Sequence, residues 1–448
     1  MTSPSPAQSV TAQGNYAGSV SRFLAYAIDL FAGTAVYTLV LAAISYVVQI
    51  VSGKQVSWNR QDIVVVVTKE PKPSILSILS NPSLCVLDSK VVTQNGGDAS
   101  PDAKSKDNAE GFLNGHSVGT GPFTLSRYTP SNEIVLVKNP RYWGGPAKVD
   151  RVVIRNIAES SSEQLELAKG SIDTALSLGQ SQADALRSAS GVIVKSTPTA
   201  TTFWLAMHND PAIGGPFANP KVQQAVRYAL DYDGIMKIAG RGALRLAGLL
   251  SPLFPGALDA REAIRSDPAK ARALLKEANM SQVNGKLSYV SGWVRFSVQV
   301  DVLVQKIQAD LAKVGINVAL NGNTRQATAA LARSGKAQFL LWTWAADYPD
   351  QDDFLFFVPG RLLAKRSAWM ENSSPQAQQL AALARQAETS NDAAARTALY
   401  KRIDRALQTE GPYAPLFVPA VPYAYRSNLT GVTNNSIWEM DFRVVNKT

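Results

Sequence analysis

A helix followed by a strand, with a glycine between them, constrains the fold more than any other feature of this chain. In residues 298–320, VQVDVLVQKIQADLAKVGINVAL, apolar residues recur at helical spacing until Gly315, and the strand INVAL follows. A second helix start is marked by Asn219 at the N-cap position and Pro220 at the first helical position. Helices that alternate with strands in this way build layered domains, so we predict an α/β fold.

An apolar run near the N-terminus predicts a membrane span. Residues 30–51, LFAGTAVYTLVLAAISYVVQIV, contain no charged side chain over 22 residues. A helix of that length is roughly 33 Å long, which is enough to cross a bilayer. A buried core helix is the alternative, but a long helix in a soluble protein usually has a polar face. We therefore predict one transmembrane helix at about residues 23–51, which contacts the lipid bilayer through residues 30–51.

The stretch that leads into this run places two charges at the entrance of the helix. In GNYAGSVSRFLAYAIDLF, Asp29 needs a partner at the edge of a span, and Arg22 supplies one. Over residues 15–60 the sequence resembles the first helix of the RDD family of small membrane proteins. That family usually has further spans, whereas none is predicted here, so residues 1–62 are interpreted as an RDD-like N-terminal segment.

The composition excludes several classes of function. The 45 Lys and Arg exceed the 35 Asp and Glu, but they are scattered, so nucleic acid is not an expected partner. The single cysteine, Cys85, excludes an internal disulfide and a cysteine zinc cluster, and His116 and His208 are too few for most catalytic metal sites. Cys85 lies in the apolar run SLCVL, which predicts a buried thiol. We expect no metal and no other cofactor.

Short strands and helices alternate after residue 62. IVVVV (63–67) predicts a buried strand, and GTGPFTLSRY (119–128) predicts a glycine-rich turn that leads into another strand. A glycine-rich loop that binds phosphate in a P-loop is followed by a helix, so this turn is not interpreted as a phosphate site.

Eight stretches, in the order in which they occur, carry a resemblance to a known family. They are GTGPFTL, VLVKNPRYWGGPAKVDRVVIRNI, AKGSIDTA, FANPKVQQAVRYALDYDGI, DPAKARALLKEAN, IQADLAKVGINV, WTWAADYPDQDDF and LYKRIDRALQTEGPYAPLFV. Over residues 63 to about 431 the chain resembles the extracellular solute-binding proteins of peptide-type ABC importers, the oligopeptide- and dipeptide-binding family. The resemblance implies an extracytoplasmic receptor that performs no enzymatic reaction and delivers its ligand to an ABC permease in the membrane.

The resemblance also implies a two-lobed, periplasmic-binding-protein-like α/β fold that closes about a hinge. Lobe I would comprise residues 63–199 and about 416–448, and lobe II would comprise about 200–415. Members of the family usually carry a longer segment before the strand at 63–67. We therefore expect lobe I to be incomplete, with an unpaired sheet edge and exposed apolar surface.

The stretch WTWAADYPDQDDF (342–354) places four aspartates among aromatic residues. A glycosidase needs two carboxylates on opposite sides of a sugar, and nothing else in the sequence supports hydrolysis. A calcium loop that began at Asp350 would place Phe354 and Leu355 where an oxygen ligand and a glycine are required. Neither enzyme nor calcium site is therefore predicted.

The four aspartates divide into two groups. Asp350, Asp352 and Asp353 are predicted to form a solvated turn or a helix cap. Asp347 follows the apolar strand FLLWTWAA (339–346), where a buried strand emerges. In the peptide-binding branch of the family, an aspartate at the corresponding position pairs with the α-ammonium of the ligand, which implies this role for Asp347. A structural cap is the alternative.

Aromatic residues on two strands complete the predicted binding site. Trp344 resembles a ring that lines a side-chain pocket, and Trp342 points to the same side of the strand. The stretch TFWLAMHND (202–210) is a second candidate wall. Phe203 and Trp204 point to opposite faces of that strand, so only one of them can contact a ligand. All these aromatic residues could instead belong to the core.

We therefore expect an extracytoplasmic solute-binding component of an ABC transporter, which binds peptides or similar small ligands and is held at the cell membrane. Two alternatives remain open. The chain could be a fragment of an RDD-like membrane protein, or a misjoined, recombined chain without a working binding site.

Overall fold

The computed structural model describes residues 66–437 and 439–448. The predicted RDD-like segment, with its span at residues 30–51 and with Arg22 and Asp29, lies outside the described residues. Within the described part of the chain, no helix combines the length and the hydropathy that crossing a membrane requires.

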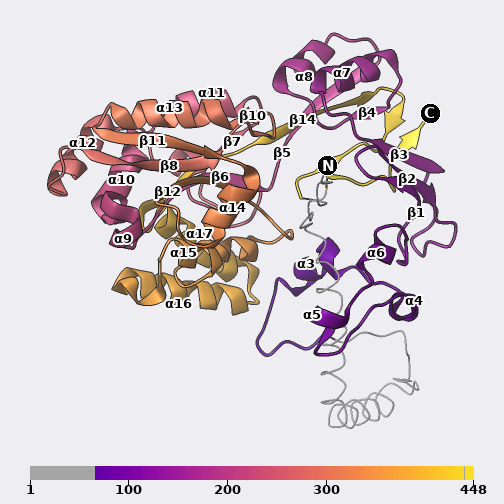
Figure 1. The fold of residues 1–448 in the computed structure, drawn as a ribbon, viewed down its shortest axis with the longest axis horizontal. Coiled ribbons are helices and arrows are strands. Elements are labelled where there is room, and N and C mark those ends of the chain that lie inside the picture. The colour runs from indigo at the N-terminus through magenta and orange to yellow at the C-terminus, as the bar shows by residue number, and fades with distance from the viewer. Residues whose placement is uncertain (1–65, 438) are drawn as a thin grey trace, which may run out of the picture. The chain divides into compact units, whose positions relative to one another are not determined.

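Internal contacts divide the chain into two compact units (Figure 1). Of the described residues, the first unit comprises 66–69 and 79–155, and the second comprises 70–78, 156–437 and 439–448. The predicted lobe I, residues 63–199, therefore contains residues of both units.

The first unit is built on an antiparallel sheet in the order β1-β2-β3. Its strands are β1 (Phe123–Thr129), β2 (Glu133–Lys138) and β3 (Arg151–Arg155), and its helices are α4 (Ser89–Gln94), α5 (Ala103–Lys106) and α6 (Glu110–Leu113). The central strand β2 carries four consecutive apolar residues (134–137), and Val135 among them is buried. The predicted glycine-rich turn leads into β1, as expected from the sequence.

Two predictions for the segment before this sheet are wrong. Val66 and Val67, the described part of the predicted strand at 63–67, are exposed and lie in no strand. Cys85 is exposed as well, although its apolar neighbours predicted burial. A short 3₁₀ helix (Pro82–Leu84) ends at Cys85, and the following residues pair with the rest of the unit through an isolated bridge at Leu87. An apolar run alone does not bury a side chain when no element covers it.

The second unit contains a six-stranded sheet in the order β11-β8-β12-β6-β13-β7. Its strands are β6 (Thr201–Met207), β7 (Leu244–Arg245), β8 (Val283–Val290), β11 (Ile316–Asn323), β12 (Phe339–Ala345) and β13 (Tyr413–Val418). The first three strands in this order are parallel, and the other neighbours are antiparallel. The predicted helix–glycine–strand step is confirmed, because Gly315, with φ of 93°, separates α13 (Val300–Ala312) from β11.

Every residue of β6 is buried, because the sheet is covered on both faces. Phe203, Leu205 and Met207 belong to one hydrophobic core, and Trp204 and Ala206 belong to another. The alternation follows from the period of two along a strand. The prediction that Phe203 and Trp204 point to opposite faces is confirmed.

Helices cover the two faces of the six-stranded sheet, as Figure 1 shows for α12 and α13 on one side and α16 and α17 on the other. The first core contains residues of α10 (Pro220–Ala229), α11 (Tyr232–Ala239), α12 (Pro268–Glu277) and α13, and the second contains residues of the 3₁₀ helix η4 (Gln351–Phe357), α15 (Leu362–Arg366), α16 (Pro375–Thr389) and α17 (Ala393–Thr409). The predicted N-cap of α10 is confirmed, since the Asn219 side chain accepts a hydrogen bond from the backbone of Lys221.

The second unit also contains a three-stranded sheet in the order β4-β14-β5. Its strands are β4 (Thr174–Ala175), β5 (Val192–Pro198) and β14 (Ala420–Arg426), and α7 (Ser160–Lys169) and α8 (Gln180–Leu186) pack on it. The remaining elements are α3 (Ile75–Leu79), α9 (Pro211–Gly214), α14 (Arg325–Arg333), and the short strands β9 (Val294–Arg295), β10 (Val298–Gln299), β15 (Leu429–Thr430), β16 (Asn434–Asn435), β17 (Glu439–Met440) and β18 (Asn446–Lys447).

The chain crosses between these two sheets twice. It passes from β5 into β6 at residues 199–200, and from β13 into β14 at Pro419. The backbone N–H of Thr199 donates to the carbonyl of Pro419 at 2.9 Å, so the two crossings are hydrogen-bonded to each other. The first predicted lobe boundary lies at the first crossing. The second, between residues 415 and 416, falls inside β13.

One buried carboxylate on α17 holds a loop of the second core. Asp404 is fully buried and accepts hydrogen bonds from the backbone N–H groups of Leu249, Leu250 and Leu258 at 2.7–2.9 Å. Burial raises the pKa of Asp404 to about 6, against the lowering effect of these hydrogen bonds. The three N–H groups have this carboxylate as their acceptor, so the loop depends on it.

We expect Asp404→Ala to lower the free energy of unfolding by roughly 3–5 kcal/mol, because it leaves buried N–H groups unsatisfied and opens a cavity. Urea unfolding, followed by circular dichroism, measures this loss. Arg402→Ala, on the exposed face of the same helix, is the control and is expected to change stability by less than about 0.5 kcal/mol. Equal losses of stability in the two variants would contradict the role of Asp404 as the acceptor that holds the loop.

Candidate functional site

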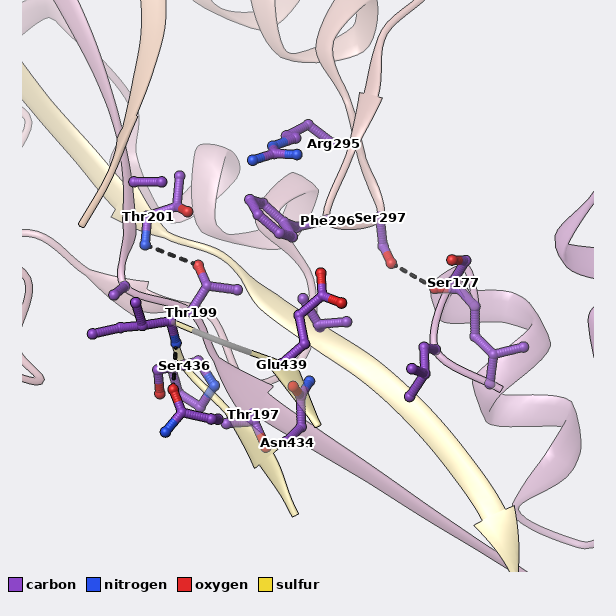
Figure 2. Close-up of a pocket in the computed structure, with 18 of the residues that line it drawn as sticks. Ser177, Thr197, Thr199, Thr201, Arg295, Phe296, Ser297, Asn434, Ser436 and Glu439 are labelled. Atoms are coloured by element: carbon purple, nitrogen blue, oxygen red, sulfur yellow. Dashed lines mark hydrogen bonds between the residues drawn. The ribbon is translucent and has the colours of Figure 1, made fainter. Parts of the chain in front are cut away.

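A cavity of about 500 Å³ lies at the crossings between the two sheets of the second unit. This volume is within the range of about 300–1,000 Å³ that small-molecule sites occupy. Figure 2 shows the side chains that face it. Four segments supply most of its wall: residues 176–179 after β4, residues 197–201 at the first crossing, residues 293–297 of the β9–β10 hairpin, and residues 434–437 and 439 of the β16–β17 hairpin.

The β9–β10 hairpin enters the cavity on a strained turn. Arg295 pairs with Val298, so Phe296 and Ser297 form a two-residue loop, with φ of 50° and 65°. Such a turn favours asparagine and glycine, and each of these two residues costs on the order of 1–3 kcal/mol in the left-handed region. The Ser297 hydroxyl donates to the carbonyl of Leu178 at 2.9 Å, which fixes the tip of the hairpin against the opposite wall (Figure 2).

Arg295 lines this cavity and carries a buried hydrogen-bond donor that no described residue satisfies. Its Nε is buried and has no hydrogen-bond partner among the described residues. Its guanidinium lies over the ring of Phe296, 4.0 Å from the ring centroid. Burial, and then the nearby charge of Arg325, lower the pKa of Arg295, while Glu439 opposes this effect. The guanidinium is therefore positioned and partly desolvated, and it can accept an anionic group.

The floor of the cavity is made by the first crossing and the β16–β17 hairpin. The Thr201 N–H donates to the Thr199 hydroxyl oxygen at 3.1 Å, and the Ala200 N–H donates to the carbonyl of Ser436 at 2.9 Å (Figure 2). The second of these bonds attaches the β16–β17 hairpin to the strand crossing. The floor consequently offers hydroxyl and backbone groups that can orient a polar ligand.

Sequence reasoning did not single out Arg295, Ser297 or Glu439. A signal was present in WVRFS (293–297), where an arginine lies between aromatic residues. However, the strands on either side of that turn are two residues long, and only tertiary contacts bring them to the cavity. Within the described residues, no three metal-ligating side chains gather at one place.

Asp347, the residue predicted to bind the ligand's ammonium, lies next to the cavity wall. The strand β12 ends at Ala345, and Ala345 and Ala346 line the cavity, whereas Asp347 does not. Its side chain is exposed, and the surrounding protein still raises the pKa of its carboxyl through partial loss of hydration. The predicted role of Asp347 in binding stays a prediction.

The two tryptophans of β12 are half-buried and lie beside the cavity. Trp342 has its ring 6.3 Å from that of Trp293, which lines the cavity. The indole Nε1 of Trp344 donates to Asp353 at 2.6 Å. Both rings pack against the second core, which confirms that they point to the same side of the strand. Neither of them lines the cavity itself.

Phe203 and Trp204 lie inside the two cores. Phe203 stacks on Phe417 with ring centroids 4.8 Å apart, and Trp204 meets Phe357 and Tyr413 edge to face. Neither residue lines the cavity, so the cavity lends no support to their predicted contact with a ligand.

The prediction that Asp350, Asp352 and Asp353 form a solvated turn is wrong, because all three are buried. Asp350 accepts two hydrogen bonds from Arg396, at 2.6 and 3.1 Å. It also caps η4 by accepting from the backbone of Asp352 at 2.8 Å, so the alternative prediction of a helix cap is confirmed for this residue.

Asp352 is held by four side chains, three of which are far from it along the chain. They are Lys72, Ser74, Tyr348 and Tyr400, at 2.8, 2.9, 3.2 and 3.2 Å. The pairing compensates for the cost of burying the charge. The sequence could not indicate burial here, because several of these partners are far away along the chain.

Asp353 differs from the other two, because no cationic side chain of the described residues pairs with it, whereas Arg396 pairs with Asp350 and Lys72 with Asp352. It is fully buried, one oxygen accepts from Trp344, and the other has no hydrogen bond among the described residues. Burial raises the pKa of Asp353 to about 7, against the lowering effect of hydrogen bonds from Trp344 and the Asp347 backbone. The Asp353 carboxyl therefore accepts hydrogen bonds from the Trp344 indole and from the backbone of Asp347, at the end of β12.

Comparison with known protein families gives one match that covers most of the chain. The model of "Bacterial extracellular solute-binding proteins, family 5 Middle" matches residues 24–360. The match begins before the stretch at 63 to about 431 on which the sequence resemblance rests, and it includes the apolar run at 30–51.

Curated relatives are similar at a distance. "Di/tripeptide-binding protein 2" of Pseudomonas aeruginosa is 27% identical over 335 residues, which is 74% of this chain and 61% of that protein. "Glutathione-binding protein GsiB" of Shigella dysenteriae is 28% identical over 380 residues, which is 82% of this chain and 69% of that protein. The chain thus spans less than two thirds of the length of the first of these relatives.

Solved structures share the fold. The "ABC transporter-associated periplasmic binding protein DppA from Helicobacter pylori in complex with peptide STSA" superposes with a TM-score of 0.68 at 24% identity, over 85% of this chain and 71% of that one. A dipeptide-binding protein from Pseudoalteromonas in complex with Met-Leu gives a TM-score of 0.68 at 20% identity, over 84% and 72%. The predicted two-lobed α/β fold of periplasmic binding proteins is confirmed.

We expect the stability of the protein to fall between pH 5 and pH 8 in part through Asp353. Its folded pKa of about 7 lies above the ordinary value of 3.8. The stability that protonated Asp353 contributes is therefore fully present at low pH and is lost as the pH rises through 7. Asp353→Asn keeps an acceptor for Trp344 and cannot ionise. This substitution is expected to gain roughly 2–3 kcal/mol relative to the wild type between pH 5 and pH 8.

Urea unfolding at pH 5, 6, 7 and 8 measures this difference. Because wild type and variant share all other titrating groups, the difference between them isolates Asp353. Parallel pH profiles for the two proteins would contradict the raised pKa.

Proposed function

Since the chain belongs to the family of bacterial extracellular solute-binding proteins, family 5, we propose that it captures short peptides or similar small ligands for an ABC importer. The names of its relatives support this class of ligand. One relative is named for binding di- and tripeptides, and another for binding glutathione, which is itself a small peptide. The protein would act as a receptor that binds and releases its ligand unchanged.

The observation that carries the proposal is the buried, unpartnered Nε of Arg295 in a cavity of ligand size. A guanidinium presents parallel N–H donors that match the two oxygens of a carboxylate. Leaving a buried donor unsatisfied costs about 1–3 kcal/mol, and a ligand that accepts from it recovers that cost. We propose that Arg295 binds the terminal carboxylate of the ligand.

The hydrogen-bonded crossings supply a hinge for ligand capture. The two crossings, at residues 199–200 and at Pro419, connect the six-stranded sheet to the β14 sheet, and the cavity is lined by segments attached to each. Rotation about two adjacent strand connections needs backbone changes at only a few residues. A ligand that contacts both sides then stabilises the closed arrangement.

The cellular setting follows from the family. We propose an extracytoplasmic position and delivery of the ligand to a permease in the membrane. Attachment to the membrane through residues 30–51, and the RDD-like character of residues 1–62, belong to the proposal on the sequence alone.

Titration of the full chain with trialanine, followed by tryptophan fluorescence, tests the proposal. Trp293 lines the cavity and is expected to report binding. Arg295→Gln is expected to weaken trialanine at least about tenfold, the effect of losing a charge pair of about 1.4 kcal/mol. Trialanine amide, which lacks the carboxylate, is expected to bind wild type and variant equally weakly.

Arg325→Gln is the matched control, because it removes a nearby positive charge that does not line the cavity. It is expected to change the affinity for trialanine by less than about threefold, since an exposed charge is screened by solvent and salt. If Arg325→Gln and Arg295→Gln weaken binding equally, the carboxylate is attracted by the general field and is not held by Arg295.

A further inference from the structure

A buried carboxylate outside the cavity holds one segment of the cavity wall, residues 176–178. Glu163 on α7 is 8% exposed, and its carboxylate accepts hydrogen bonds from the backbone N–H groups of Leu176 at 2.7 Å and of Ser177 at 3.2 Å. Leu176 and Ser177 line the cavity, whereas Glu163 does not. The carboxylate therefore acts on the cavity only through the wall segment.

The helix α7 holds this wall segment at a further point. The Ser160 hydroxyl donates to the carbonyl of Ser177 at 3.0 Å. The side chain of Leu178 is buried in the small hydrophobic cluster that contains residues of α7, α8 and β14. The backbone of the segment is thereby fixed as far as Leu178.

The carbonyl of Leu178 is the group that receives the β9–β10 hairpin. It accepts the hydrogen bond from the Ser297 hydroxyl at 2.9 Å (Figure 2). The same hairpin carries Arg295, and Trp293 directly precedes it, and both of these residues line the cavity. A series of hydrogen bonds and peptide units therefore leads from Glu163, through the wall segment, to the hairpin that carries Arg295.

Resting on the proposed function, we infer that Glu163 is a positioning residue for the ligand site, whose ionised carboxylate orients residues 176–178 and, through Ser297, the hairpin that carries Arg295. Hydrogen bonds from backbone N–H groups to a carboxylate are stronger than those to a neutral acceptor. Loss of the charge on Glu163 therefore loosens the wall segment and the hairpin together, and it lowers the affinity for the ligand.

Protonation is one way to remove this charge. Burial raises the pKa of Glu163 above its ordinary value of 4.5, while the hydrogen bonds from Ser177 and Leu176 oppose this effect. The elements packed against α7 carry four side chains that can be charged, namely Asp184 on α8 and Tyr423, Tyr425 and Arg426 on β14. None of these four groups accounts for the raised pKa. At pH 4.5, more than half of the ligand-free protein therefore carries a protonated Glu163.

Titration of the full chain with trialanine at pH 7.5 and pH 4.5, followed by tryptophan fluorescence, tests the inference. Glu163→Gln keeps the size of the side chain and one acceptor oxygen, but it cannot ionise. At pH 7.5 it is expected to weaken trialanine at least about threefold relative to the wild type. At pH 4.5 the difference is expected to shrink below about twofold, because Glu163 of the wild type is then protonated as well. All other titrating groups are common to the two proteins.

Glu159→Gln is the matched control, because it removes an exposed carboxylate at the start of the same helix, where the side chain makes no capping hydrogen bond. It is expected to change the affinity for trialanine by less than about twofold at both pH values, since an exposed charge is screened. A loss in Glu163→Gln that is equally large at both pH values would contradict the inference, because a general disturbance of α7 does not depend on the ionisation of Glu163.

Ser297→Ala tests the path from the wall segment to the hairpin without changing α7, so it is informative even if Glu163→Gln does not fold. Its loss of affinity relative to the wild type is expected to shrink from pH 7.5 to pH 4.5 in the same way. At pH 7.5 the double variant is expected to lose less than the product of the two single losses, because both substitutions break the same path. A loss in Ser297→Ala that does not depend on pH, or single losses that multiply, would overturn the path.

The possible results separate the inference from the proposed function. If the wild type does not bind trialanine at pH 7.5, the proposed function fails and the inference falls with it. If the wild type binds, Arg295→Gln weakens binding and Glu163→Gln binds like the wild type at both pH values, the proposed function stands and the positioning role of Glu163 is overturned.

Discussion

Strand β6 is buried on both of its faces, and the second unit is organised around this constraint. A strand in that position must place large apolar side chains on alternate sides, as Phe203 and Trp204 do. Each side then recruits its own layer of helices, α10–α13 on one face and α15–α17 on the other. Because β6 cannot shift without disturbing both cores, its first residues provide a fixed edge for the cavity.

The cavity combines several features that cost stability. Phe296, Ser297 and Glu439 adopt left-handed backbone conformations, and Arg295 keeps a buried donor without a partner. Such locally unfavourable features persist at functional sites where the surrounding structure fixes them. Here the hydrogen-bonded crossing and the two hydrophobic cores provide the compensating stability. A ligand carboxylate that accepts hydrogen bonds from Arg295 would offset part of this cost.

The sequence predicted the elements that depend on local chemistry. The N-cap at Asn219 and the helix end at Gly315 were correct, because the residues that set them are neighbours in the chain. It failed where burial depends on distant partners. Asp350 and Asp352 looked like a solvated turn, yet Arg396 and Lys72 cover them. Conversely, Val66 and Cys85 lie in apolar runs but are exposed.

For the same reason, the site was only partly visible in the sequence. The family resemblance directed attention to β12, whose end does line the cavity at Ala345 and Ala346. Arg295 and Glu439 lie on hairpins with strands of two residues, too short for a periodic pattern to predict. Their meeting in one cavity depends on the tertiary fold alone.

A crystal structure of the full chain with trialanine at saturating concentration would test the central claim most directly. We expect the peptide in the cavity at the strand crossings, with its carboxylate oxygens within hydrogen-bonding distance of the Arg295 guanidinium. A peptide bound elsewhere on the protein, or held in this cavity without contact to Arg295, would contradict this mode of binding.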